Sequence, residues 1–372
     1  MHILMTVNAA WNIWNFRRPV LEHLLAEGHD VTVLAPPDDS VAELTSLGCR
    51  FIPLKMDVKG FNPVRDIALT RRLWSIFRRG RYDVILSYTI KNNIFGAMAA
   101  KALGIPFLPN VSGLGTAFLS SRWVQIIAEG LYRKAFAGLP VVFFQNADDR
   151  GLFIERRLIG DHQARLLPGS GIDLTRFSPA PYPDDNTAPV FLLVARLLRD
   201  KGVVEFVDAA RQVKRSVPEA RFQLLGAGAA ENRTAIAAAT VDGWVADGIV
   251  EYLGTTTDVR PFLAAAACVV LPSYREGAPR TLIEAAAMAR PLIATDVPGC
   301  RSVVDPELSG YLCEVRDADS LATAILRFLA LSQSDRQRMG RAGRDKMERQ
   351  FDQALVVDAY IDAIATATQR KP

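Results

Sequence analysis

Two glutamates in the last third of the chain have the types and the spacing to bind a polyhydroxylated ligand. Glu276 stands in a polar Gly-Pro loop after an apolar, strand-like run at residues 267–271, and Glu284 stands eight residues later. Residues 281–288 read as a helix, so the two carboxylates span a strand–loop–helix unit. In open α/β sheets, ligands bind at the carboxyl ends of the strands. A carboxylate accepts hydrogen bonds from two vicinal hydroxyls, as on ribose or a hexose.

The loop between the two glutamates also offers backbone donors. The amides of Gly277, Ala278 and Arg280 lie where the helix is expected to begin, and the helix dipole there favours anionic or oxygen-rich groups. The alternative is that Glu284 is a solvated helix residue and Glu276 an ordinary loop charge, because this spacing also arises by chance.

A pair of cations precedes the acidic pair in the chain. Arg196 and Lys201 come after an apolar run at residues 190–195 and just before a helical pattern that begins at Val203. A guanidinium, an ammonium and a helix N-terminus at one point favour a diphosphate site, where they could stabilise the charge on a departing nucleotide diphosphate. No metal would then be required. The alternatives are a solvated surface pair, and Arg199 as a different partner.

Two glycine pairs mark places where the backbone can approach a ligand. Gly226 and Gly228 follow an expected strand and favour contact with the base or ribose of a nucleotide, although a plain turn explains them equally well. Gly113 and Gly115 would let another loop approach the phosphates of a nucleotide-linked donor or a second substrate, the acceptor. Lys91 is a candidate phosphate contact on the acceptor side, and its alternative is an exposed loop lysine.

The first strand-to-helix loop, expected at residues 8–19, contains no glycine. A dinucleotide-binding fingerprint needs glycines there so that the backbone can approach a pyrophosphate, which argues against a nicotinamide enzyme. Aromatic residues are unusual in such a loop, and they indicate either burial under a lid or a platform for a sugar or lipid-linked acceptor. The acceptor-side candidates in this loop are Asn12, Trp14 and Arg17.

Short apolar runs alternate with helical patterns along the chain, which is typical of a parallel, doubly wound α/β sheet. In the first half we expect strands at residues 2–7, 31–35, 50–54, 84–88, 107–111, 141–145 and 165–167, and helices at 19–27, 67–79, 93–103 and 120–136. In the second half we expect strands at residues 190–195, 221–225, 249–253, 267–271 and 291–295. The length of 372 residues favours two domains.

A proline-rich stretch at residues 179–189 is the clearest linker in the chain. We therefore expect a first domain at residues 1–178 and a second at residues 190–351. The tail at residues 352–369 reads as a helix.

Composition indicates an ordinary globular protein with a mildly basic charge. The formal net charge is +4, and the basic surplus lies in the first half of the chain. The four cysteines and four histidines are scattered, so neither disulfides nor a metal site is expected. Because no run of about 20 apolar residues and no signal-peptide pattern is present, we expect a cytoplasmic protein.

Residues 59–81 carry seven Lys and Arg residues against a single acidic residue, with Trp74 and Phe77 among them. The pattern fits an amphipathic helix with a solvated basic face, or a helix at a membrane surface with anionic headgroups. Residues 120–136, with Trp123 and Ile126, form a second such segment. No recognised nucleic-acid motif accompanies the charge, so we expect a membrane surface as partner and no nucleic acid.

Together these motifs resemble the retaining, nucleotide-sugar-dependent glycosyltransferases of family 4, which share an E-x7-E motif. The resemblance rests on Glu276 and Glu284, on the R-x4-K pattern of Arg196 and Lys201, and on residues 191–202, 224–228, 252–254 and 294–301 in chain order. Residues 88–96 and 110–116 are similar to the branch that builds polyprenyl-diphosphate-linked glycans. The resemblance implies a GT-B fold, with two Rossmann-like domains facing a central cleft and a terminal helix that packs back onto the first domain.

The resemblance also implies roles for the site residues. Arg196, Lys201 and Glu276 would be catalytic, and Glu284 would bind the ribose hydroxyls. The donor sugar would lie near Glu276 and the loop amides, no metal cofactor would be needed, and the leaving phosphate could accept the acceptor's proton.

Three positions depart from the family pattern. Ala278 stands where many relatives have Phe, no glycine stands near Ala289 and Arg290, and no histidine stands near Thr89. For this reason we name no general base among the side chains.

We therefore expect a hexosyltransferase that moves a hexose or N-acetylhexosamine from a UDP-sugar, with retention, to a lipid-diphosphate-linked or glycan acceptor in bacterial surface polysaccharide assembly. The acceptor would bind the basic first domain at the inner face of the plasma membrane. One alternative is a non-hydrolysing UDP-sugar epimerase of similar fold, against which the histidine-poor loops argue. Another is a non-catalytic nucleotide-sugar-binding protein. The sequence predicts neither the donor sugar, the linkage nor the oligomeric state.

Overall fold

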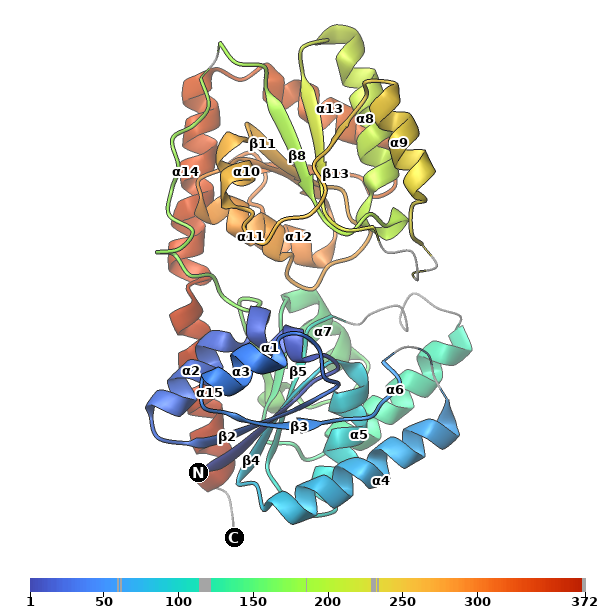
Figure 1. Cartoon of the computed structure of the whole chain (residues 1–372), viewed down its shortest axis with the longest axis vertical. Coiled ribbons are helices and arrows are strands. Elements are labelled where there is room, and N and C mark those ends of the chain that lie inside the picture. The colour runs from blue at the N-terminus through green and yellow to red at the C-terminus, as the bar shows by residue number, and fades with distance from the viewer. Residues whose placement is uncertain are drawn as a thin grey trace. The chain divides into compact units, whose positions relative to one another are not determined.

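The computed structural model describes residues 1–58, 60, 62–113, 122–184, 186–228, 232 and 234–369. The chain forms two compact units (Figure 1). The first unit contains residues 1–171 together with the C-terminal segment from residue 353, and the second contains residues 172–352.

The described residues of the first unit form a seven-stranded parallel sheet with the order β3-β2-β1-β4-β5-β6-β7. Apolar residues fill these strands because helices cover both faces of the sheet. Its strands are β1 (His2–Thr6), β2 (Asp30–Ala35), β3 (Arg50–Pro53), β4 (Val84–Tyr88), β5 (Phe107–Val111), β6 (Val142–Phe144) and β7 (Ala164–Leu166).

Two sets of helices bury the two faces of the first sheet. One core lies under α1 (Ala10–Phe16), α2 (Arg18–Ala26), α3 (Val41–Ser46) and α15 (Gln353–Gln369). The other core lies under α4 (Pro63–Gly80), α5 (Ile90–Lys101), α6 (Arg122–Phe136) and α7 (Ala147–Glu155). The helix expected at residues 120–136 thus begins at residue 122 in the described part, and residues 120 and 121 lie outside it.

The second unit repeats this architecture with a parallel sheet of six described strands in the order β10-β9-β8-β11-β12-β13. Its strands are β8 (Val190–Val194), β9 (Arg221–Leu225), β10 (Glu251–Tyr252), β11 (Cys268–Leu271), β12 (Leu292–Thr295) and β13 (Gly310–Cys313). One face packs against α8 (Val203–Ser216), α9 (Ala238–Ala246) and α13 (Ala318–Leu329). The other packs against α10 (Arg260–Ala265), α11 (Arg280–Ala287), α12 (Pro298–Val303) and α14 (Gln333–Gln350).

The segment at residues 179–189, which was expected to be a linker, is hydrogen-bonded to the second unit. The buried guanidinium of Arg290 donates from Nη2 to the carbonyls of Ala180 at 2.8 Å and Pro181 at 2.5 Å. The Tyr182 hydroxyl donates to the Ala267 carbonyl at 2.9 Å. These bonds tie the segment to residues just after α11 and just before β11, and the division into two units falls after residue 171.

Within the described ranges, no helix is long and apolar enough to cross a membrane.

Candidate functional site

The two halves of the candidate site follow neighbouring strands. β8 and β11 pair in parallel, so their carboxyl ends meet at one edge of the second sheet. The strand order reverses between them, with β9 and β10 beyond β8, and β12 and β13 beyond β11. Such a switch point leaves a crevice that binds ligands. Arg196 and Lys201 follow β8, and Glu276 and Glu284 follow β11.

Lys201 and Glu276 form an ion pair across this switch point. The distance from Lys201 Nζ to Glu276 Oε1 is 2.5 Å, and the side chains are 25% and 12% exposed. Water screens such a shielded pair less than a surface pair, and each charge depends on its partner. The pair therefore fixes an ammonium and a carboxylate at one point of the edge.

Backbone contacts hold the two loops together. The Asp200 carbonyl accepts hydrogen bonds from the Tyr274 amide at 2.9 Å and from the Ser273 hydroxyl at 3.1 Å. Gly202 has a φ of 72°, and a Cβ at this position would lie 2.0 Å from the carbonyl oxygen of Pro272. Only glycine permits this approach. Sequence reasoning missed these contacts, because hydrogen bonds between distant loops leave no local pattern.

A third loop supports Glu276. The N-terminus of α12 packs so closely that a Cβ on Gly299 would lie 2.6 Å from the carbonyl oxygen of Glu276. At the end of β12, the Thr295 hydroxyl donates to the carbonyl of Ser273. Loops that follow three adjacent strands thus hold Glu276 in place. Residues 294–301 take part because Thr295 and Gly299 contact the loop that carries Glu276.

Glu284 is buried on the second turn of α11 and is paired with Arg280. It is 9% exposed, and its Oε1 accepts a hydrogen bond from Arg280 Nε at 2.6 Å. Burial raises the pKa of Glu284 above its usual value, while the positive charges of Arg280 and Arg176 act in the opposite direction. The hydrogen bond from Arg260 lowers the pKa of Asp258 to about 2, and this nearby negative charge also raises the pKa of Glu284. Glu284 is therefore not a solvated helix residue.

Arg196 supplies a second positive charge after β8. Its side chain is exposed and has no hydrogen-bond or ion-pair partner within the described part of the chain. An arginine without a carboxylate partner is available to bind an anion in a bidentate manner. Among the residues described, no group of three or more His, Cys, Asp or Glu residues has metal-binding geometry.

The first glycine pair of the site uses its backbone in two ways. Gly226 donates its amide to the Gly254 carbonyl at 2.8 Å, and its own carbonyl accepts from the Tyr252 hydroxyl at 3.0 Å. Both polar groups of Gly226 therefore serve the fold. Gly228 is exposed beside it.

The other predicted loop positions are less constrained. Gly277 and Ala278 are half-buried on the loop that leads into α11, and Ala278 packs against the core beneath that helix. Gly113 has a φ of 141°, which favours glycine, and it follows β5 in the first unit. Gly115 lies outside the described residues.

The prediction of a loop at residues 8–19 was wrong, because most of this segment forms the helix α1. Ile13 lies in the core, and no glycine interrupts the helical turn. Asn12 and Trp14 are half-buried on α1, and the Arg18 guanidinium carbon lies 4.4 Å from the centre of the Trp14 ring. These acceptor-side candidates thus stand on a helix at the carboxyl end of β1.

Arg17 is buried where α1 meets α2. Its side chain is 3% exposed, its guanidinium carbon lies 4.8 Å from the centre of the Tyr88 ring, and Nη1 donates to the Gly169 carbonyl at 3.5 Å. Its Nε has no partner among the described residues. A buried guanidinium without a carboxylate is costly, so Arg17 remains a candidate for anion binding.

Lys91 is not an exposed loop lysine. It lies in the first turn of α5, and its Nζ is 2.8 Å from Asp66 Oδ1 on α4, with exposures of 14% and 4%. Thr89, just before α5, has a φ of 71° and donates its hydroxyl to Asn92 Oδ1 at 3.1 Å. The charge of Lys91 is therefore largely neutralised inside the first unit.

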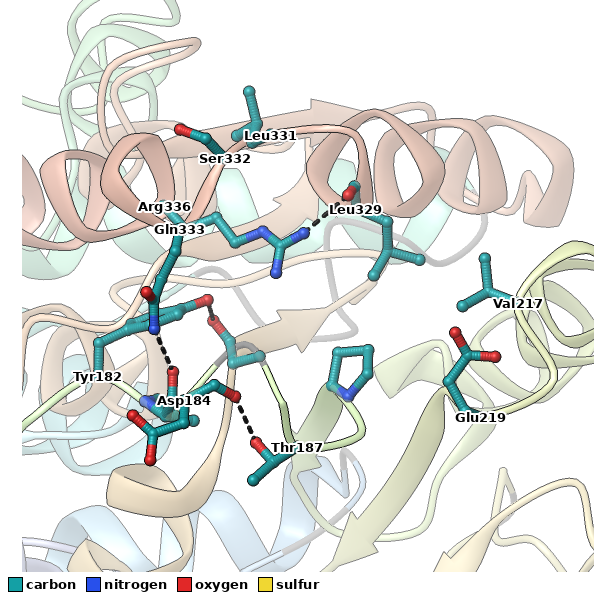
Figure 2. Close-up of a pocket in the computed structure, with 13 residues that line it drawn as sticks. Tyr182, Asp184, Thr187, Val217, Glu219, Leu329, Leu331, Ser332, Gln333 and Arg336 are labelled. Carbon is teal, nitrogen blue, oxygen red and sulfur yellow. Dashed lines mark hydrogen bonds between the residues drawn. The ribbon is translucent and has the colours of Figure 1, made fainter.

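A pocket of about 430 Å³ in the second unit lies away from the candidate site. Figure 2 shows its lining, to which Tyr182, Gln333 and Arg336 contribute polar groups. The lining residues Pro189 and Ala267 directly precede β8 and β11, so the pocket lies at the amino edge of the sheet. Lys201 and Glu276 lie at the opposite edge.

Two doubly wound parallel sheets in one chain, with cations and carboxylates meeting at the switch point of the second sheet, are features of the GT-B glycosyltransferases. Family models match both units. Residues 13–169 match the glycosyl transferase 4-like domain, and residues 188–330 match the glycosyl transferases group 1.

Individual proteins agree with these matches. The chain is 26% identical over 377 residues to the N,N'-diacetylbacillosaminyl-diphospho-undecaprenol alpha-1,3-N-acetylgalactosaminyltransferase of Campylobacter jejuni, with 97% of each chain covered. It is 26% identical over 303 residues to the UDP-Gal:alpha-D-GlcNAc-diphosphoundecaprenol alpha-1,3-galactosyltransferase of Escherichia coli, covering 78% of this chain and 75% of that protein. The crystal structure of Anabaena HepE in complex with UDP matches with a TM-score of 0.78 at 16% identity, over 98% of this chain and 100% of that chain.

The chain therefore belongs to family 4 of the glycosyltransferases and has the GT-B fold. The predicted family, fold class and enzyme class are confirmed.

Proposed function

We propose that the protein transfers a hexose or N-acetylhexosamine from a UDP-sugar, with retention, to a lipid-diphosphate-linked sugar during assembly of a bacterial surface glycan. The observation that carries this proposal is the ion pair between Lys201 and Glu276 at the β8–β11 switch point. It places a cation for a diphosphate and a carboxylate for sugar hydroxyls at one point, 2.5 Å apart.

The cations serve the leaving group. As the bond between the anomeric carbon and the diphosphate oxygen breaks, negative charge grows on that oxygen. Lys201 shares its charge with Glu276, whereas the Arg196 guanidinium is uncommitted among the described residues. The first turn of α8, which begins at Val203, adds backbone N–H donors. These groups supply positive charge without a metal ion, so we propose metal-independent transfer.

The carboxylates serve the donor's hydroxyls. Glu284, buried on α11, accepts hydrogen bonds from the ribose, and Glu276 with the amides of Gly277, Ala278 and Arg280 faces the sugar. The new bond joins the anomeric carbon to an acceptor oxygen. The acceptor proton passes to the departing diphosphate, which makes a protein base unnecessary.

The relatives support the choice of substrates. The names of both relatives include a sugar linked through a diphosphate to undecaprenol, and both describe an alpha-1,3 transferase. The name of the second also gives UDP-Gal. The similar HepE structure holds UDP. An α-linked product from an α-linked UDP-hexose corresponds to retention.

A lipid-linked acceptor calls for contact with a membrane, and the first unit has a suitable surface. Trp123 is 77% exposed in the first turn of α6, and Ile126 and Ile127 on the next turn are 52% and 49% exposed. On α4, Val64 and Ile67 are 77% and 55% exposed. The first turns of α4 and α6 lie toward the same end of the first unit (Figure 1).

Positive charge accompanies this exposed apolar surface. The side chains of Arg71, Arg72, Arg78 and Arg79 on α4 are exposed. Basic residues beside Trp and Ile favour binding to anionic lipid headgroups. We therefore propose that the protein works as a peripheral protein at the inner face of the plasma membrane.

The test is to incubate the purified protein with radiolabelled UDP-hexoses and an undecaprenyl-diphosphate-linked N-acetylhexosamine, and to determine the product's anomeric configuration by NMR. We expect acceptor-dependent UDP release and an α-linked product in the presence of a chelator. Epimerised UDP-sugar without acceptor would indicate the epimerase alternative. UDP binding without turnover across the full set of donors and acceptors would indicate a non-catalytic protein.

A further inference from the structure

The side chain of Arg280 donates a hydrogen bond to Glu284. The E-x7-E motif specifies only the two glutamates and does not require an arginine at this position. The geometry points to Arg280 as a positioning residue: its guanidinium holds the Glu284 carboxylate in the orientation that binds the nucleotide's ribose. This inference rests on the proposed function, because it concerns the same nucleotide site.

The contact is specific in its atoms. Arg280 is the first residue of α11, and Glu284 lies one turn later on the same side of the helix. Arg280 Nε donates to Glu284 Oε1 at 2.6 Å, a short distance typical of a charge-assisted hydrogen bond. The arginine side chain is 34% exposed and the glutamate side chain 12%. The arginine thus reaches inward from the rim of the site to a buried acid.

A buried glutamate needs such a partner for two reasons. Its side chain has three rotatable bonds, and a fixed donor on Oε1 selects one orientation among several. Burial also favours the protonated acid, which has fewer acceptor sites for hydroxyl groups. The ionised carboxylate that binds two vicinal hydroxyls is therefore the form that a neighbouring cation stabilises.

The charges around Glu284 make Arg280 the dominant stabilising group. Arg280 acts through both charge and a hydrogen bond, whereas Arg176, from the segment before β8, acts through charge alone. Asp258, in the loop before α10, opposes them because its own negative charge disfavours ionised Glu284. Without the Arg280 guanidinium, Glu284 would keep the favourable charge of Arg176 against the unfavourable charge of Asp258.

A competing explanation is that Arg280 binds the diphosphate directly, as Arg196 and Lys201 are proposed to do. The two explanations differ in the part of the nucleotide whose binding depends on Arg280. A positioning role through Glu284 requires the 2′ and 3′ hydroxyls of the ribose. A direct role requires only the phosphates.

The experiment compares UDP with 2′,3′-dideoxy-UDP by isothermal titration calorimetry on the full-length protein and its variants. For Arg280→Leu we expect UDP to bind about 10-fold more weakly at neutral pH, the size of one lost hydrogen bond to a charged group. The dideoxy nucleotide should bind as it does to the unaltered protein, which also shows that the variant is folded. Arg280→Lys, which keeps the charge, should restore part of the loss.

A pH series adds a readout that a merely structural role would not move. Alkaline pH restores the ionised form of Glu284, so the UDP affinity of Arg280→Leu should recover in part as the pH rises. The matched control is Arg211→Leu, which removes a half-exposed arginine paired with Asp208 on α8 at 3.1 Å. This control should bind both nucleotides normally at every pH.

Equal losses for UDP and the dideoxy nucleotide in Arg280→Leu would overturn the inference in favour of a phosphate contact. Unchanged UDP binding in that variant would overturn it as well, while leaving the proposed function intact. If the unaltered protein binds no UDP, the proposed function fails and the inference fails with it.

Discussion

Lys201 Nζ lies 2.5 Å from Glu276 Oε1, although 75 residues separate the two in the chain. Each residue stands on a loop that other contacts already fix: the Asp200 carbonyl joins the loops, and Gly202 and Gly299 allow their close packing. The pair is thus a product of the tertiary structure, and it should respond to mutation as a unit.

The first prediction concerns this pair. Lys201→Ala should lower kcat for sugar transfer by about 10²–10³-fold, the usual effect of losing one preorganised group that stabilises developing charge. The double variant Lys201→Ala/Glu276→Ala should be scarcely worse than either single variant, because the two residues act together. Initial-rate kinetics on all three proteins provide the measurement.

Lys214→Ala is the control for this experiment, because Lys214 is a half-buried lysine on α8, outside the candidate site, that donates to the Gly248 carbonyl at 2.7 Å. It should leave kcat unchanged. Strictly multiplicative losses in the double variant would show that Lys201 and Glu276 act independently.

The second prediction is a pH dependence at Glu284. Its pKa is raised in the native state, so its favourable contribution to the unfolding free energy is fully present below the usual carboxyl pKa and is lost as the pH rises through the raised pKa. Relative to Glu284→Gln, the wild-type protein should therefore lose stability between acidic and neutral pH. Denaturant unfolding of both proteins at several pH values measures the difference. A wild-type unfolding free energy that rises toward neutral pH, relative to that of Glu284→Gln, would contradict the raised pKa of Glu284.

The third prediction tests the close approach of the two loops. Gly202→Ala should destabilise the second unit by more than about 2 kcal/mol, since the new Cβ meets the Pro272 carbonyl as well as an unfavourable φ. Gly248→Ala is the matched control, because Gly248 has a φ of 67° with open space around it. That variant should lose only about 1 kcal/mol. Thermal unfolding with and without UDP measures both effects, and equal losses would mean that the loop contact contributes nothing.

The fourth prediction separates structure from function at Lys91. Lys91→Ala leaves Asp66 as a buried, unpaired carboxylate and should destabilise the first unit by about 3–5 kcal/mol. Lys91→Met/Asp66→Asn removes both charges and should restore most of that stability. If the double variant folds but transfers no sugar, Lys91 also contacts the acceptor; if it retains activity, the lysine is structural.

The fifth prediction concerns the membrane surface. Trp123→Ser should weaken binding to vesicles of anionic phospholipid by at least about 10-fold, because the variant has lost an exposed tryptophan that would enter the headgroup region. Val245→Ser, which changes an exposed apolar residue on α9 of the second unit, should not. Vesicle co-sedimentation at two salt concentrations measures the effect. Equal binding of both variants would place the membrane contact elsewhere.

Local patterns were enough to predict most of the sheets. The bounds of β4, β5 and β9 agree with the expected strands at residues 84–88, 107–111 and 221–225, because apolar runs between turn residues define them. The helix α1 was missed, since its aromatic and asparagine residues show weak helical periodicity. The burial of its Ala10 and Ile13 depends on the core beneath the helix, which a local pattern does not reveal.

The site divides in the same way. The strand–loop–helix positions of Arg196, Lys201, Glu276 and Glu284 were visible in the sequence. The contact of Arg280 with Glu284 was missed, because the helix expected at residues 281–288 leaves Arg280 outside it. The pairing of Lys91 with Asp66 was also missed, because it joins two helices.

The helix α15 completes the first unit although the whole second unit precedes it in the chain. Its Tyr360 is fully buried, and the hydroxyl accepts a hydrogen bond from Asn110 Nδ2 at 2.9 Å. During synthesis, the first unit therefore begins to emerge from the ribosome before the second unit and yet stays unfinished until residues 353–369 have been made. A nascent chain released before that point lacks the helix that covers part of one face of the first sheet, so synthesis of α15 is itself a condition for a correctly folded first unit.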